Sequence, residues 1–213
     1  MMPTNIVDKI IGELDTALRT LMPPALRASL RASPANGLHE AVLDNQAKQH
    51  SAGLMRVNHA GEVCAQALYQ GQALTAQLAD IKEQMQAAAI EETDHLAWCE
   101  IRLQELGAKP SLFNPLWYAG SFVLGALAGL AGDKISLGFV AETEKQVSAH
   151  LQKHQQLIAR EDHKTQAILK QMQDDEEQHA AAALQAGGIV LPDAVRQLMR
   201  LVSKIMTKSS YHC

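Results

Sequence analysis

Two short strings in this chain each place a carboxylate and an imidazole three residues apart. They are Glu91-Glu92-Thr93-Asp94-His95 and Asp175-Glu176-Glu177-Gln178-His179, so each contains Glu-x-x-His. Residues at i and i+3 share one face of a helix, so the Glu and the His of each string can converge on one point. Oxygen and imidazole ligands without a thiolate suit iron or manganese better than a structural zinc ion. The spacing therefore predicts a metal site.

Each motif interrupts an apolar stripe with helical spacing. The first stripe is Ile81, Met85, Ala88, Glu92, His95, Cys99, Leu103 and Leu106, and the second is Leu169, Met172, Glu176, His179, Ala183 and Ala186. Recurrence every three or four residues is typical of the core side of a bundle helix. An ionised carboxylate there is strongly disfavoured unless it is paired or bound to a cation. A layer of satisfied polar residues is the alternative, and two copies in register favour metal.

Two further stripes each carry one central carboxylate. They are Leu137, Val140, Glu144, Val147, Leu151, His154 and Ile158, and Met55, His59, Glu62, Ala65, Tyr69, Ala73 and Ala76. The register selects Glu144 over Glu142, because Glu142 falls on a poorer face. Each half of the chain thus has a helix with one Glu followed by a helix with Glu-x-x-His. This constellation is the one found in ferritin-like di-iron and di-manganese carboxylate bundles, where four carboxylates balance two divalent cations.

Composition agrees with one helical domain. The chain has 213 residues, 47% of them hydrophobic and only 4% aromatic, and its net charge of −4 includes the predicted ligands. Nothing in it indicates a nucleic-acid surface. Cys64, Cys99 and Cys213 form no C-x-x-C pair and are odd in number. We therefore expect a reducing compartment, with Cys64 and Cys99 as small residues that pack between helices.

The periodicity predicts an all-α fold, a ferritin-like four-helix bundle with an apolar crossover helix between two helix-pair halves and flanking N- and C-terminal helices. Bundle helices are expected at about 51–77, 80–106, 134–160 and 162–186. A final helix from Asp193 to Lys208 would turn Val195, Leu198, Met199 and Val202 inward. Residues 1–50 are expected to form an amphipathic helix, with Ile6, Val7, Ile10, Ile11, Leu14 and Leu18 on one side, and a Pro-containing loop. Residues 51–213 would form the ferritin-like domain.

The segment 111–132 between the two halves contains no charged residue. Its run of about sixteen apolar residues is shorter than the about twenty that a spanning helix needs. A span would also separate the two halves of the predicted metal site. A buried crossover is one interpretation, and a crossover that dips into one leaflet or lines an apolar substrate channel is the one we favour.

Several of these strings resemble one family. Arg56-Val57-Asn58-His59-Ala60-Gly61-Glu62 resembles the opening motif of the demethoxyubiquinone hydroxylases, which are di-iron monooxygenases of ubiquinone biosynthesis. The stretches that end at His95 and His179, and Asn114-Pro115-Leu116-Trp117, are similar to that family as well. The similarity covers about residues 51 to 208. The first fifty residues contribute nothing to it.

The resemblance implies the ligands, the reaction and the place of action. Two iron ions would be held by Glu62, Glu92, His95, Glu144, Glu176 and His179, with Glu92 and Glu176 bridging. The enzyme would use O2 to hydroxylate the ring of a polyprenyl demethoxyubiquinol, as a peripheral protein on the cytoplasmic side of the cell membrane, which segment 111–132 would contact. Homo-oligomers and other ubiquinone-biosynthesis proteins are the partners to be expected, and nucleic acid is not.

Some positions depart from the family or remain open. Some members have a His-Tyr pair after the third ligand, whereas here Leu151 follows His150. We interpret His150 as lying on a solvated face with Lys153, and Tyr69 as a core tyrosine. Asp94 is the candidate for holding a ligand histidine by its free N–H. The alternatives for function are another ferritin-like di-metal oxidase or ferroxidase, and a non-catalytic lipid-binding bundle at the membrane surface.

Overall fold

The computed structural model describes residues 6–23 and 27–213, and this part of the chain contains helices and no strand. The helices are α1 (Ile6–Leu21), α2 (Asn45–Thr75), α3 (Ala79–Glu105), α4 (Asn114–Leu130), α5 (Asp133–Leu157), α6 (His163–Gln185) and α7 (Asp193–His212). The all-α class predicted from the periodicity is confirmed.

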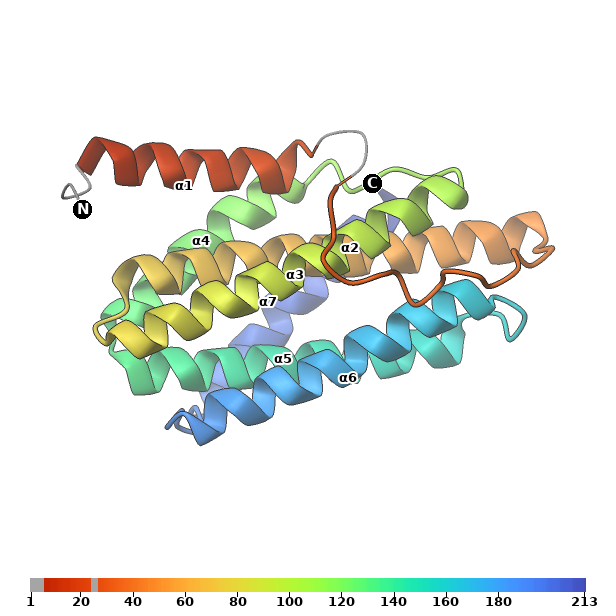
Figure 1. Ribbon diagram of the computed structural model, residues 1–213. Helices are drawn as coiled ribbons and strands as arrows, with labels where there is room; N and C mark the ends of the chain where they lie inside the picture. The colour runs from red at the N-terminus through yellow and green to blue at the C-terminus, as the bar shows by residue number, and fades with distance from the viewer. Residues whose placement is uncertain (1–5, 24–26) are drawn as a thin grey trace.

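Four of these helices form the bundle. Helices α2 and α3 pack as one antiparallel pair and α5 and α6 as another, and the two pairs lie face to face (Figure 1). Helix α4 crosses from the end of α3 to the start of α5, so that α3 and α5 run in the same direction (Figure 1). Short turns can join antiparallel neighbours, but a connection between parallel helices must run the length of the bundle. The predicted bundle with a crossover helix is confirmed.

Helix α2 begins earlier than the apolar stripe indicates. Asp44 is its N-cap, and a carboxylate oxygen of Asp44 accepts a hydrogen bond of 2.7 Å from the backbone N–H of Ala47. Such a cap satisfies one of the free N–H groups of the first turn. The helix therefore starts at Asn45 rather than at 51, because its first turns are polar and carry no apolar signal.

Glycines set the distance between α4 and α2. A Cβ at Gly71 would overlap the carbonyl oxygen of Phe122, and one at Gly125 would overlap the carbonyl oxygen of Leu68. The two backbones are thus in direct contact. The opposite side of α4 is exposed and apolar: Leu116, Val123, Leu124, Leu127 and Leu130 lie on it. Within a single chain the crossover is therefore not fully buried. No helix in the described residues has both the length and the hydropathy to span a membrane.

The prediction that α7 turns its apolar side inward is wrong. Leu198 is 60% exposed and Val202 is 44% exposed, while Met199 is partly buried. Helix α7 crosses α2 obliquely and is attached mainly near its end, where Ser210 is buried and Arg56 donates to the carbonyl oxygen of Tyr211. Amphipathic periodicity identifies an apolar side but does not specify what covers it.

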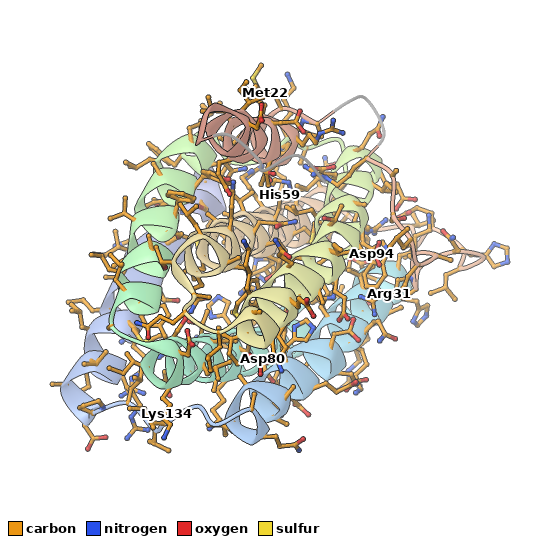
Figure 2. All side chains as sticks on the ribbon, turned by 60° about the vertical axis from the view of Figure 1, so that its left-hand side comes forward. Met22, Arg31, His59, Asp80, Asp94 and Lys134 are labelled. Carbon is orange, nitrogen blue, oxygen red and sulfur yellow. The ribbon has the colours of Figure 1, made fainter. Side chains whose placement is uncertain are left out.

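Three helices, α1, α4 and α7, expose large apolar side chains. Helices α4 and α7 lie together along one edge of the view in Figure 2, with α1 at its upper end. Helix α1 exposes Ile11, Leu14 and Leu18, and α7 exposes Leu198, Leu201, Val202 and Ile205. With the outer side of α4 they make what we call the apolar edge. Exposed apolar area of this extent on several helices is typical of an interaction surface.

Candidate metal centre

The six predicted ligands come from all four bundle helices. Helix α2 contributes Glu62, α3 contributes Glu92 and His95, α5 contributes Glu144, and α6 contributes Glu176 and His179. Five of the six are buried, and His179 is partly exposed. One possible ligand atom from each of Glu62, Glu92, His95 and Glu176 lies within 4.8 Å of the others. Glu144 and His179 are not in this group of four. Glu144 is buried and Glu142 only partly so, which agrees with the register, and the choice of Glu144 as a ligand stays a prediction.

Both histidines direct Nδ1 into the cluster. Nδ1 of His95 lies 3.4 Å from Glu62 Oε2, 3.3 Å from Glu92 Oε2 and 3.2 Å from Glu176 Oε1. Nδ1 of His179 lies 3.1 Å from Glu176 Oε2 and 3.5 Å from Glu92 Oε1. Glu92 and Glu176 therefore each present one oxygen to each histidine. A carboxylate in that place can join two adjacent cations.

Several ligand atoms in the cluster lack a hydrogen-bond partner among the described residues. They are Oε2 of Glu62, both carboxylate oxygens of Glu92 and Nδ1 of His95. Buried polar atoms without partners are rare in proteins, and each of them needs an explanation such as a bound ion. These atoms are hard oxygens and an imidazole nitrogen, the donor set that iron and manganese accept. The ferritin-like arrangement and this cluster indicate a metal site.

Without a cation, protons balance the charges of the cluster. Burial, together with the charge of Glu92, raises the pKa of Glu62 well above its ordinary value. Burial and the charge of Glu176 raise the pKa of Glu144 in the same way. Burial lowers the pKa of His179, but the adjacent carboxylates of Glu176 and Glu92 outweigh it and raise that pKa to about 12. Cations that bind here would displace these protons.

The outward nitrogen of each histidine meets a carboxylate from the opposite motif. Nε2 of His95 lies 2.9 Å from Asp175 Oδ2, and Nε2 of His179 lies 2.8 Å from Glu91 Oε2. A carboxylate in this position orients the ring and makes the other nitrogen a better ligand. The candidate Asp94 is wrong for this direct role, because its oxygens accept from the backbone N–H of Leu30 and from Arg31 instead.

The sequence contained a signal for the correct partners. Glu91 and Asp175 occupy the same place, directly before the Glu of each Glu-x-x-His motif. The two motifs are related by the internal repeat, so equivalent places should carry equivalent roles. That symmetry would have selected Glu91 and Asp175 over Asp94.

The structure adds one contact to the predicted environment of Tyr69 and changes the predicted environment of His150. Tyr69 is a buried core residue as expected, but its hydroxyl also donates to the carboxylate of Glu144. His150 is partly buried, with its ring edge-on to that of His154 at 4.3 Å between centroids. The solvated-face interpretation of His150 is therefore wrong. Its ring lines a pocket of about 230 Å³ between α2, α5 and α7.

Comparison with known proteins places the chain among relatives of defined activity. The family described as "Ubiquinone biosynthesis protein COQ7" matches residues 49–210. The chain belongs to this COQ7 family. A "3-demethoxyubiquinol 3-hydroxylase" of Legionella pneumophila (strain Corby) is 65% identical over 212 residues, 100% of each chain. One of Acinetobacter baumannii (strain SDF) is 56% identical over 206 residues, 97% of each chain. The family resemblance read from the motifs is confirmed.

A solved structure supports the fold of this COQ7 chain independently. It is a dodecameric thioferritin, the bacterioferritin-related protein from Bacteroides fragilis, which aligns with a TM-score of 0.54 at 19% identity. The alignment covers 74% of this chain and 90% of the other. At this identity the likeness is evidence for a ferritin-like fold alone. The hydroxylase relatives establish that the COQ7 chain is an enzyme, an oxidoreductase of ubiquinone biosynthesis.

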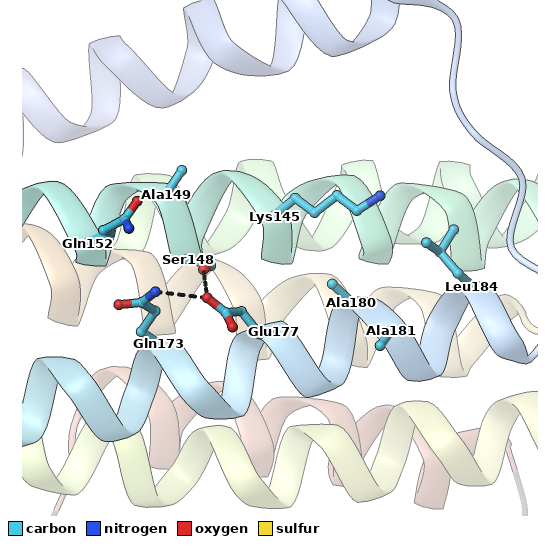
Figure 3. Close-up of a pocket in the computed structure, with 9 residues that line it drawn as sticks. All are labelled: Lys145, Ser148, Ala149, Gln152, Gln173, Glu177, Ala180, Ala181 and Leu184. Atoms are coloured by element: carbon cyan, nitrogen blue, oxygen red, sulfur yellow. Dashed lines mark hydrogen bonds between the residues drawn. The ribbon is translucent and has the colours of Figure 1, made fainter.

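One surface pocket lies apart from the predicted metal ligands. It has a volume of about 410 Å³ and lies between α5 and α6 (Figure 3). Glu177 lies among the residues that line the pocket and accepts hydrogen bonds of 3.1 Å from Ser148 and 2.8 Å from Gln173. None of the six predicted ligands is among the residues that line it. This pocket is therefore separate from the predicted metal site.

Proposed function

We propose that this enzyme hydroxylates the ring of a polyprenyl demethoxyubiquinol with O2. The observation that carries the proposal is the buried Glu-His cluster in a chain that is 65% identical over its full length to a 3-demethoxyubiquinol 3-hydroxylase. In such a reaction one oxygen atom of O2 is inserted into a ring C–H bond to give a hydroxyl group. The other oxygen atom leaves as water after taking two electrons and two protons, which a separate reductant such as reduced nicotinamide supplies. A long prenyl tail partitions into lipid, which gives the apolar edge a purpose.

Two iron ions would be held in two positions. Glu62 and His95 would be ligands of one ion, at what we call the His95 position. Glu144 and His179 would be ligands of the other ion, at the His179 position. Glu92 and Glu176 would bridge the two, as the distances from their oxygens to both histidines support. A bound pair of ferrous ions supplies redox chemistry with O2 that side chains alone lack.

The protein's own residues would do the remaining work. Asp175 and Glu91 hold the rings of His95 and His179 so that Nδ1 stays directed inward. Tyr69 holds one oxygen of Glu144 by a hydrogen bond. Met172 and Cys99 are fully buried in the apolar core that adjoins the site. Such walls exclude water, which would otherwise compete with the substrate and O2 for the metals.

The apolar edge would attach the enzyme as a peripheral protein to the cytoplasmic side of the cell membrane. Its support is the exposure of Leu124 and Leu127 on α4 and of Leu201 and Ile205 on α7. Within this scheme, residues 51–213 would be the ferritin-like domain and residues 1–50 an attached segment. Flotation with phospholipid vesicles tests the attachment, and Leu201→Gln combined with Leu124→Gln should reduce the bound fraction.

Metal analysis and product analysis test the function together. Protein reconstituted anaerobically with ferrous iron should contain two irons per chain, and Glu176→Ala should lose most of them. With a short-tailed demethoxyubiquinol, ¹⁸O2 and reduced nicotinamide as electron donor, the hydroxylated product should carry one newly introduced ¹⁸O atom. Iron binding without product would leave a ferroxidase or another di-metal oxidase. Absence of specific iron would contradict the enzyme mechanism and favour a lipid-binding bundle.

A further inference from the structure

A segment that precedes the matched family region packs beside the predicted metal ligand His95. Residues 27–44 form no helix apart from a short turn, and we call them the N-terminal strap. The family match begins at residue 49, after the strap. In Figure 1 the strap crosses in front of α3 on its way to the start of α2. At one end of the strap Arg27 forms an ion pair with Glu100 at 2.8 Å. At the other end Glu40 forms an ion pair with the buried Arg102 at 2.7 Å.

The middle of the strap joins the two helices that carry the Glu-x-x-His motifs. Nε of Arg31 lies 3.0 Å from Asp94 Oδ2 on α3, and its Nη1 lies 2.8 Å from Asp175 Oδ2 on α6. The backbone N–H of Leu30 donates to the other oxygen of Asp94 at 2.6 Å. Figure 2 shows Arg31 and Asp94 side by side at this edge of the bundle. The planar guanidinium can hold two carboxylates in fixed directions at once.

One carboxylate oxygen is shared between Arg31 and a predicted metal ligand. Oδ2 of Asp175 lies 2.8 Å from Arg31 Nη1 and 2.9 Å from His95 Nε2. Nη2 of Arg31 also lies 3.3 Å from His95 Nε2. Because that nitrogen already directs its hydrogen to Asp175, the last contact is a close approach of two donors. Arg31 thus fixes the oxygen that fixes the ring of His95.

Trp98 completes the arrangement around Arg31. The guanidinium carbon lies 4.9 Å from the centre of the Trp98 ring, a cation–π distance. The indole Nε1 of Trp98 donates to the carbonyl oxygen of Arg31 at 3.3 Å, and its ring lies against that of His95 with 5.4 Å between centroids. The strap, Trp98 and Asp175 together cover His95, which is fully buried.

The other histidine has a different environment. His179 pairs with Glu91, whose side chain is 51% exposed, whereas Asp175 is 8% exposed. The internal repeat makes the two Glu-x-x-His motifs alike, but the strap reaches only the His95 side in the described structure. A charged hydrogen bond is stronger when solvent is excluded from it. The two metal positions therefore differ in how firmly their histidines are held.

We propose that Arg31 is a positioning residue that makes the His95 position bind its metal ion more tightly than the His179 position does. The inference rests on the proposed metal centre. Arg31 acts through Asp175 on the ring of His95, without contact to substrate. Loss of an outer partner of a metal-binding histidine typically lowers metal affinity by about 10–100-fold. Removing Arg31 should have an effect of this order at one position only.

The test is an anaerobic titration of the full-length protein with Co²⁺, in which visible absorption reports the amount of bound Co²⁺. Two variants that each keep one metal position allow the two affinities to be measured separately. Glu144→Gln would leave the His95 position and Glu62→Gln the His179 position. In the first background Arg31→Gln should weaken Co²⁺ binding about 10-fold or more. In the second it should change the affinity little. Arg19→Gln, which removes an exposed arginine that lies outside the strap and pairs with Asp15, is the control and should leave both affinities within error.

Other outcomes separate a positioning role from a purely structural one. Arg31→Lys keeps the charge but cannot hold both carboxylates in one plane, so it should recover the binding only in part. Unchanged Co²⁺ binding in Arg31→Gln, or equal weakening in both backgrounds with a matching loss of apoprotein thermal stability, would overturn the inference. Wild-type protein that binds no Co²⁺ would overturn the metal centre itself, which is a distinguishable result.

Discussion

Oδ2 of Asp175 lies 2.9 Å from Nε2 of His95, and this contact joins the two Glu-x-x-His motifs across the bundle. The reciprocal contact runs from His179 to Glu91 at 2.8 Å. Each motif therefore supplies predicted metal ligands and also the carboxylate that contacts the histidine of the other motif. Folding of the two halves against each other is what completes either position.

Asp175→Asn tests the first of these contacts. The amide can accept from His95 but carries no charge, so we expect ferrous iron to bind the His95 position about 10-fold more weakly. Mössbauer spectra of protein given one and two equivalents of ⁵⁷Fe measure the occupancy of each position. Glu91→Gln is the matched variant and should weaken the His179 position instead. Identical spectral changes in the two variants would contradict the assignment.

Glu144 and Glu142 provide a test of register on one helix. Glu144 is buried in the cluster, whereas Glu142 is partly buried and accepts from Gln146 at 2.6 Å. Glu144→Gln should lower the iron content from two ions to about one per chain, because an amide is a poor ligand for hard cations. Glu142→Gln should retain both ions. Elemental analysis after anaerobic reconstitution measures the difference, and iron loss in Glu142→Gln would refute the register.

Tyr69→Phe removes the hydroxyl that donates to Glu144. A buried carboxylate oxygen without its donor costs about 1–3 kcal/mol of stability, and more when the group is charged. We expect a lower melting temperature and weaker metal binding at the His179 position, with the His95 position unchanged. Differential scanning calorimetry and iron titration provide the two measurements. Equal metal affinity in wild type and variant would show that the hydroxyl does not position Glu144.

Gly125 and Gly120 on α4 form a matched pair for the crossover contact. A Cβ at Gly125 would overlap the carbonyl oxygen of Leu68, whereas a Cβ at Gly120 meets nothing within 4 Å. Gly125→Ala should destabilise the protein by about 1–3 kcal/mol through overpacking. Gly120→Ala should stabilise it by up to about 1 kcal/mol through helix propensity. Urea denaturation measures both, and a neutral Gly125→Ala would contradict the close approach of α4 to α2.

The environment of His154 leads us to expect that the free energy of unfolding decreases in acid. Burial, with the nearby His150 and Lys153, lowers the pKa of His154 from 6.5 to about 3, and its Nδ1–H donates to Asn58 at 2.8 Å. The unfolded chain takes up a proton below pH 6.5 that the folded protein does not. Folding stability from this group is therefore present above pH 6.5 and is lost as pH falls toward 3, at up to about 1.4 kcal/mol per pH unit.

The matched variant for this prediction is His154→Gln, which cannot take up the proton. The advantage of wild type in free energy of unfolding should shrink steadily between pH 6.5 and 4. Denaturant titrations of the apoprotein at several pH values measure that difference. A difference that does not depend on pH would show that His154 is protonated in the folded state as easily as in the unfolded one.

The predictions made from the sequence succeeded where the determining pattern is local. The stripes around Glu92, Glu144 and Glu176 specify helices and their core sides, because side-chain direction in a helix follows from the spacing along the chain. The same stripes selected Glu144 over Glu142, and burial in the structure agrees. Boundaries were less certain where polar residues begin a helix, as at Asn45.

Only the tertiary structure decided which residues of distant segments contact each helix. The contact of His95 with Asp175 spans 80 residues and that of Leu30 with Asp94 spans 64, distances at which periodicity carries no information. The outward side of α7 and the hydrogen bond from Tyr69 to Glu144 depend equally on how helices pack. The sequence alone determined the helical bundle and predicted the ligand types, since both follow from local spacing. The environment of each ligand, including Arg31 behind His95, arises only when distant segments come together.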